Sequence, residues 1–159
     1  MMVCAYFWYY ADTYTQWHFI DNINLIFHEA GHTIFSFFGD FINVFAGSGF
    51  QVALPFIISI YFFNNGQNIS GSFCLLWVGQ NLLNVSIYVG DAVSMKLNLL
   101  GGDSVVHDWN YLLNSFGALS HTQTIALVIY SLGIMSIFTG TFLSLYYSWS
   151  MELNKPYLE

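Results

Sequence analysis

The chain has 159 residues, 56% of them hydrophobic and only 7% charged, whereas roughly 25% of the residues in a typical water-soluble domain are charged. Nine acidic residues outnumber two basic ones, Lys96 and Lys155, which gives a formal net charge of −7. The sequence argues against a water-soluble domain and also against nucleic-acid binding, because almost nothing could neutralise phosphate groups. We expect an all-α, multi-pass integral membrane protein surrounded by a lipid bilayer.

We expect one membrane domain over residues 1–159, in three parts. Residues 1–20 should lie at the membrane interface, because the apolar run at residues 3–11 is too short to span a bilayer and is rich in Tyr and Trp, which prefer the headgroup level. Residues 21–96 hold the main chemical motifs. Residues 97–159 form a polar connection, a last span and a short tail.

The most specific motif is H-E-x-x-H at residues 28–32, inside a first apolar run over about residues 22–38. On a helix, His28 and His32 project from one face, so two neutral imidazoles can bind one metal ion. A zinc ion (Zn²⁺) would lower the pKa of a bound water towards roughly 7, and the neighbouring Glu29 would take its proton as general base. The alternative is a helix whose two histidines only form hydrogen bonds within a core.

The second apolar run, residues 50–63, is too short to cross a bilayer alone. Either its helix begins earlier, or residues 46–49 form a re-entrant loop that lines a cavity. Pro55 lies inside this run and lacks a backbone N–H, so a local kink is expected there.

The third apolar run, residues 72–95, carries a polar stripe. With successive residues 100° apart, Gln80, Asn84, Asp91 and Ser94 fall within an arc of about 80°. Such a stripe avoids lipid, so we expect it to face the interior that holds the H-E-x-x-H motif. Alternatively, the amide side chains of this run only hydrogen-bond to neighbouring helices.

Residues 97–121 form the longest polar connection, in which His107 and Asp108 offer a second pair of possible ligands. The hydrophobic spacing that follows predicts a short amphipathic helix capped near Asp108. A last apolar run over residues 122–149 ends in Tyr and Trp at a membrane interface. The expected architecture is therefore about four transmembrane helices plus one short amphipathic helix.

These motifs together resemble the site-2 protease-like family of intramembrane zinc metalloproteases. Residues 28–32 match the family's H-E-x-x-H motif, and residues 81–84 with Gly90 and Asp91 are similar to its N-P-D-G-like element, whose aspartate completes the zinc site. No proline lies in this second element, and glycine precedes the aspartate. The resemblance covers about residues 20–95 and implies hydrolysis of peptide bonds in a membrane-protein or peptide substrate.

The third metal ligand is assigned to Asp91. This residue shares the polar stripe, lacks a basic partner in the sequence, and stands where the family's aspartate is expected. His107 and Asp108 are the alternatives, because a turn at Gly101-Gly102 could fold their segment back over the site. With Asp91 as ligand, His107 is expected to be catalytic and to stabilise the tetrahedral oxyanion.

Two further functions fit the same motif. One is a non-catalytic membrane chaperone or scaffold in which the metal is structural, and the other is a zinc hydrolase that acts on a lipid or another amide. A structural zinc site normally has four protein ligands, whereas a catalytic site keeps three and an open position. The number of ligands therefore separates the first possibility from the enzymes.

Overall fold

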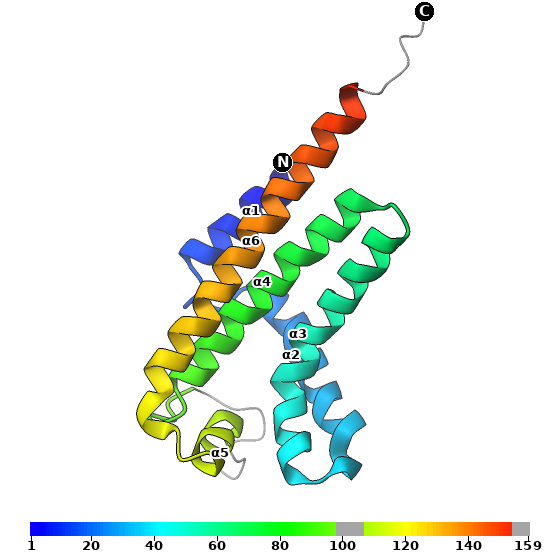
Figure 1. Ribbon diagram of the computed structural model, residues 1–159. Helices are drawn as coiled ribbons and strands as arrows, with labels where there is room; N and C mark the ends of the chain where they lie inside the picture. The colour runs from blue at the N-terminus through cyan, green and yellow to red at the C-terminus, as the bar shows by residue number, and fades with distance from the viewer. Residues whose placement is uncertain (98–106, 154–159) are drawn as a thin grey trace, which may run out of the picture.

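The protein was analysed as a computed structural model that describes residues 1–97 and 107–153 (Figure 1). These residues form helices joined by short turns and contain no strand, so the all-α prediction is confirmed for them. The helices are α1 (Met2–Asp12), α2 (Phe19–Phe35), α3 (Asp40–Asn64), α4 (Asn68–Gly90), α5 (Asp108–Ser115) and α6 (Thr122–Leu153), with 3₁₀ turns η1 (Ser36–Phe38) and η3 (Leu119–His121).

Three helical segments in the described part of the chain are long and apolar enough to cross a membrane: Asp40–Asn64, Asn68–Gly90 and Leu119–Met151. The expected first span, residues 22–38, is not among them, so a count of four spans is not confirmed. Its helix, α2, has 17 residues and passes into η1. Gly39 then turns the chain with a φ of +92°, which favours glycine, and α3 begins at the next residue.

The helix α3 settles the alternatives for the second apolar run. It has 25 residues and starts at Asp40, so the helix begins earlier than residue 50 and residues 46–49 are helical. Of the two alternatives, the earlier helix start is therefore confirmed and the re-entrant loop is excluded. Pro55 lies inside this helix and is buried, which leaves one backbone carbonyl in the preceding turn without its usual helical donor.

The helices α4 and α6 run side by side and make the most extensive contact in the bundle (Figure 1). Small residues let their backbones approach: a Cβ added to Gly79 would lie 2.6 Å from the carbonyl oxygen of Gly133. The helix α1 packs against this pair, and one core cluster joins Phe7 and Tyr10 of α1 to apolar residues of α4 and α6. The segment expected at the membrane interface therefore contains a helix that is packed on the bundle.

The helix α5 lies at the end of the bundle opposite the α3–α4 turn, the same end at which α2 stops and α3 begins (Figure 1). Gly31 of α2 allows a close approach to α3, because an added Cβ would clash with the carbonyl group of Ala46. The indole N–H of Trp109 in α5 donates to Ser48 Oγ of α3 at 3.0 Å. The predicted short helix near Asp108 is confirmed as α5, and its position brings residues distant in sequence to α2.

Candidate metal centre

Three side chains converge where α5 meets α2. His28 Nε2 and His32 Nε2 lie 3.0 Å and 3.2 Å from Asp108 Oδ2, and 3.0 Å from each other. The two histidines are one helical turn apart on α2, and Asp108 is the first residue of α5. These three ligand atoms all lie within 4.8 Å of one another, so the group could hold a metal ion.

The partners of the two Nδ1 atoms bear on which nitrogen of each imidazole carries the proton. His32 Nδ1 lies 2.9 Å from the backbone carbonyl oxygen of Asn43, and His28 Nδ1 lies 3.1 Å from Gln51 Oε1. Both partners are acceptors and favour the neutral tautomer with its proton on Nδ1 and its lone pair on Nε2, which is the form that binds a metal ion; without an ion, Asp108 Oδ2 is a competing acceptor at Nε2. In the metal-binding form, two nitrogen lone pairs and a carboxylate oxygen face one another, an arrangement that needs a positive charge at its centre.

Glycine on α3 leaves the space that such a charge requires. A Cβ added to Gly47 would lie 2.5 Å from His32 Nε2 and 2.7 Å from His28 Nε2. Any side chain at this position would therefore fill the point on which the donor atoms converge. The donor set of two imidazoles and one carboxylate, together with this space, fits a transition-metal ion such as zinc.

A cavity of about 610 Å³ opens beside the three side chains. Glu29 is exposed and lines this cavity, as do His28, His32 and Asp108. Tyr88 of α4 also lines it, and its ring centroid lies 5.9 Å from that of His28. The general base expected from the motif therefore has access to the same space as the metal-ligand atoms.

Asp91, the expected third ligand, lies outside this group. It follows the last residue of α4, where its Oδ1 accepts hydrogen bonds from Ser94 Oγ and from the backbone N–H of Lys96 at 3.0 Å. Its Oδ2 accepts from the backbone N–H of Leu97 at 2.8 Å. Burial alone would raise the pKa of Asp91, but these donors outweigh it and lower the pKa. The chain thus supplies backbone donors in place of the basic partner that the sequence lacks, and the group that could hold a metal ion contains Asp108 where Asp91 was expected.

His107, the expected catalytic histidine, is placed against Asp91. Its Nδ1 accepts a hydrogen bond from the backbone N–H of Asn110 at 3.3 Å, which caps α5, and its Nε2 lies 3.4 Å from Asp91 Oδ2. His107 is buried and is not among the residues that line the cavity. His107 therefore caps the first turn of α5 and lies away from the cavity in which we expected it to act.

The amides of α4 do face the interior, as the polar stripe predicted. Gln80 Oε1 accepts from Asn24 Nδ2 of α2 at 2.8 Å, and Asn84 Oδ1 accepts from Gln51 Nε2 of α3 at 3.1 Å. Both form hydrogen bonds between helices, and Asn84 also lines the cavity. Gln51 was not identified from the sequence. A single amide within a long apolar run could have indicated a residue that faces a polar interior.

No family model, curated protein or solved structure matches this chain. The resemblance to site-2 proteases therefore stays a prediction from the motif, and the chemistry of the centre rests on the geometry described above.

Proposed function

We propose that this protein is a multi-pass membrane peptidase that depends on zinc and hydrolyses peptide bonds in or near the bilayer. The observation that carries this proposal is the convergence of His28 Nε2, His32 Nε2 and Asp108 Oδ2 beside a cavity that Glu29 also lines. Three apolar helices of spanning length support a membrane location.

Each side chain of the centre has a separate role in this proposal. His28, His32 and Asp108 hold the ion, which when bound supplies a Lewis acid that polarises a carbonyl group and activates water. Glu29 takes the proton of the attacking water and passes it to the leaving amine. The cavity holds the extended substrate backbone beside Glu29.

The arrangement favours a catalytic centre over a structural one. The candidate group in the described part of the chain has three ligating residues, and one side of it is open to the cavity. A structural zinc site normally closes around four protein ligands, which would leave no position for water or substrate. The open cavity thus supports the hydrolase and argues against a scaffold with a structural metal.

The test separates metal binding from turnover. The protein is reconstituted in liposomes with a library of single-span peptides, cleavage products are identified by mass spectrometry, and bound zinc is measured by elemental analysis. Glu29→Gln should keep its zinc and lose turnover by roughly 10²- to 10⁴-fold, as expected for a general base. His28→Ala should lose the zinc as well.

Asp40→Asn is the matched control for charge. Asp40 is an exposed acid at the start of α3 and does not line the cavity, so its substitution should change neither zinc content nor turnover. Equal cleavage by Glu29→Gln and the unmodified protein would overturn the proposal. Failure of the zinc-loaded, unmodified protein to cleave any peptide of the library would do the same.

A further inference from the structure

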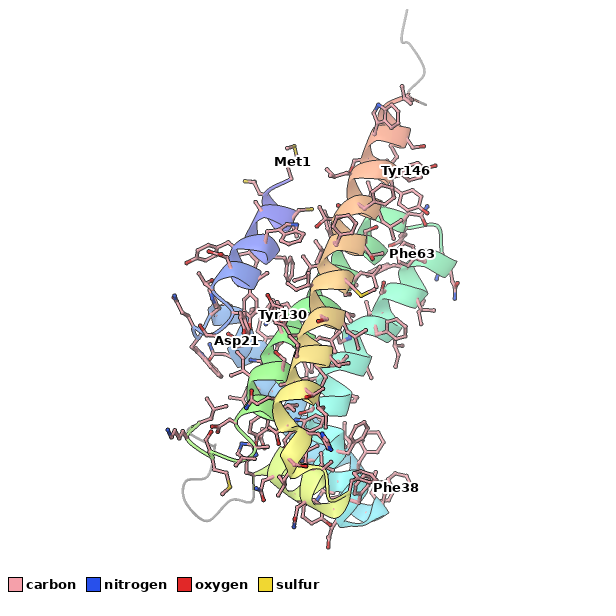
Figure 2. All side chains as sticks on the ribbon, turned by 60° about the vertical axis from the view of Figure 1, so that its left-hand side comes forward. Met1, Asp21, Phe38, Phe63, Tyr130 and Tyr146 are labelled. Atoms are coloured by element: carbon pink, nitrogen blue, oxygen red, sulfur yellow. The ribbon has the colours of Figure 1, made fainter. Side chains whose placement is uncertain are left out.

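Asp21 is a buried carboxylate that does not touch the proposed metal ligands. It lies in the first turn of α2 with an exposed fraction of 2%, about midway along the height of the bundle in Figure 2. Its Oδ2 accepts from the backbone N–H of His18 at 2.7 Å, and its Oδ1 accepts from Tyr10 Oη, Gln80 Nε2 and Asn84 Nδ2 at 2.8, 2.9 and 3.3 Å. These four donors offset part of the cost of burying this charge, and burial still raises the pKa of Asp21 above its ordinary value.

One of these donors begins a series of hydrogen bonds, the hydrogen-bond chain, that reaches the proposed metal centre. Asn84 gives its N–H group to Asp21, so its oxygen faces Gln51 Nε2 at 3.1 Å. Gln51 in turn presents its oxygen to His28 Nδ1 at 3.1 Å. The hydrogen-bond chain therefore runs from Asp21 on α2 through α4 and α3 and returns to α2.

The carboxylate gives this hydrogen-bond chain its direction. An ionised carboxylate can only accept hydrogen bonds, whereas each amide has a donor end and an acceptor end. Once Asp21 accepts from Asn84, the orientation of Asn84 and then of Gln51 is decided. The acceptor that reaches His28 Nδ1 holds a proton there, and the lone pair of Nε2 is left facing the centre.

We propose that Asp21 is a positioning residue that selects the metal-binding tautomer of His28 through Asn84 and Gln51. This inference rests on the proposed metal centre. Without the charge of Asp21, both amides can turn over together and present an N–H group to His28 Nδ1. The proton of the neutral imidazole would then move to Nε2 and occupy the position of the metal–nitrogen bond.

A second branch from Asp21 provides a matched control. Gln80 Nε2 donates to Asp21 at 2.9 Å, Asn24 Nδ2 donates to Gln80 at 2.8 Å, and the indole N–H of Trp77 donates to Asn24 at 3.0 Å. This branch starts at the same carboxylate, and its two amides, Gln80 and Asn24, are buried. It ends on Trp77, and none of its side-chain hydrogen bonds involves His28 or His32.

The experiment measures zinc affinity by competition with a chelator in detergent. Asp21→Asn should weaken zinc binding by roughly 10- to 100-fold, the usual cost of losing a group that orients a ligand. Gln51→Glu should restore most of that loss in the Asp21→Asn background, because a carboxylate at position 51 accepts from His28 Nδ1 without help. Asn24→Leu, which interrupts only the second branch, should leave zinc affinity unchanged.

A spectroscopic measurement tests the tautomer without zinc. With ¹⁵N-labelled histidine in the metal-free protein at a pH where the imidazoles are neutral, His28 should carry its proton on Nδ1, and in Asp21→Asn on Nε2. The signal is assigned by its loss in His28→Ala. This readout stays valid if the unmodified protein binds no zinc, so failure of the proposed function and failure of this inference can be told apart.

Two results would overturn the inference. One is a folded Asp21→Asn protein with unchanged zinc affinity and unchanged His28 tautomer. The other is a loss of affinity that Gln51→Glu does not restore and that Asn24→Leu reproduces, which would make Asp21 a purely structural residue. If Asp21→Asn does not fold, Asn84→Leu interrupts the same hydrogen-bond chain and is expected to show the same loss and the same restoration.

Discussion

Residues 107 and 108 belong to two different aspartate–histidine groups: His107 lies beside Asp91, and Asp108 lies beside His28 and His32. The two groups differ in the partners that their histidine Nδ1 atoms have. His107 accepts a backbone N–H at Nδ1, so in the neutral ring its proton is on Nε2, which lies 3.4 Å from Asp91 Oδ2 without a hydrogen bond. His28 and His32 face oxygen acceptors at Nδ1, which favours the tautomers whose Nε2 lone pairs face Asp108. The distances alone, 3.4 Å against 3.0 and 3.2 Å, do not distinguish these two groups.

The comparison shows how the surrounding hydrogen bonds distinguish a candidate metal centre from another contact between an aspartate and a histidine. In the first group, donors from the chain already satisfy the Asp91 carboxylate, and a cation would add little. In the second group, acceptor atoms meet acceptor atoms, and a cation completes the arrangement. The direction of the surrounding hydrogen bonds therefore carries more information than the presence of an acid beside a histidine.

The largest expected effect comes from filling the metal position itself. Gly47→Ala should reduce bound zinc to background, because the new methyl group would occupy the space between His28 Nε2 and His32 Nε2. Gly90→Ala is the control, since its Cβ would meet only ordinary contacts at 3.7 Å or more. Elemental analysis of the purified proteins gives the answer, and stoichiometric zinc in Gly47→Ala would place the ion elsewhere.

A smaller but still large effect is expected at the third ligand. Asp108→Asn should weaken zinc binding by more than the roughly 10- to 100-fold typical of groups outside the first ligand shell. Asp91→Asn, the same chemical change in the other group, should weaken it by less than about 10-fold, because Asp91 acts only on the position of α5. Chelator competition compares the two variants, and a reversed order would return Asp91 to the role of ligand.

Substitutions in the Asp91 group should change the free energy of unfolding more than they change zinc affinity. Asp91→Asn should cost about 1–3 kcal/mol of unfolding free energy, because the backbone N–H groups of Lys96 and Leu97, which hold the turn after α4, lose a charged acceptor. The lowered pKa of Asp91 makes this contribution complete above its ordinary pKa of about 3.9 and lost as the pH falls through the still lower folded value. Thermal unfolding at pH 7 and pH 3 should therefore show a difference from the unmodified protein that shrinks in acid. A difference that grows in acid would contradict the assignment.

The smallest expected effect belongs to Ser94, whose hydroxyl group donates to Asp91. Ser94→Ala should lower stability by about 1 kcal/mol, the net value of a single hydrogen bond, and should leave zinc affinity unchanged. Calorimetry and chelator competition on the same sample would separate the two readouts. A clear loss of zinc affinity would show that the two groups are coupled more tightly than their hydrogen bonds indicate.

The sequence predicted those features that depend on neighbours along the chain. Helical periodicity and a capping position were enough to place α5 near Asp108, and the spacing of His28 and His32 was enough to place them on one face. The third ligand could not be predicted in this way. The donors that satisfy Asp91 come from backbone groups at residues 96 and 97, which reach it only because the chain turns back after α4.

The number of spans also depended on information that a hydropathy pattern lacks. The apolar run that contains the motif continues to Phe38, yet the helix ends at Phe35 because a 3₁₀ turn and Gly39 redirect the chain into α3. Conversely, the second run looked too short because residues 46–49 are small, although they continue the helix. Ala46 and Gly47 among them allow close packing against α2, and Gly47 leaves the space beside His28 and His32.

The separation of 80 residues between His28 and Asp108 imposes an order of events during biosynthesis. Both histidines leave the ribosome well before α3, α4 and finally the aspartate that completes the centre. A nascent chain that ends before α5 would therefore lack the third ligand. In the proposed peptidase, this order postpones hydrolysis until Asp108 and the helices that enclose the substrate have been synthesised.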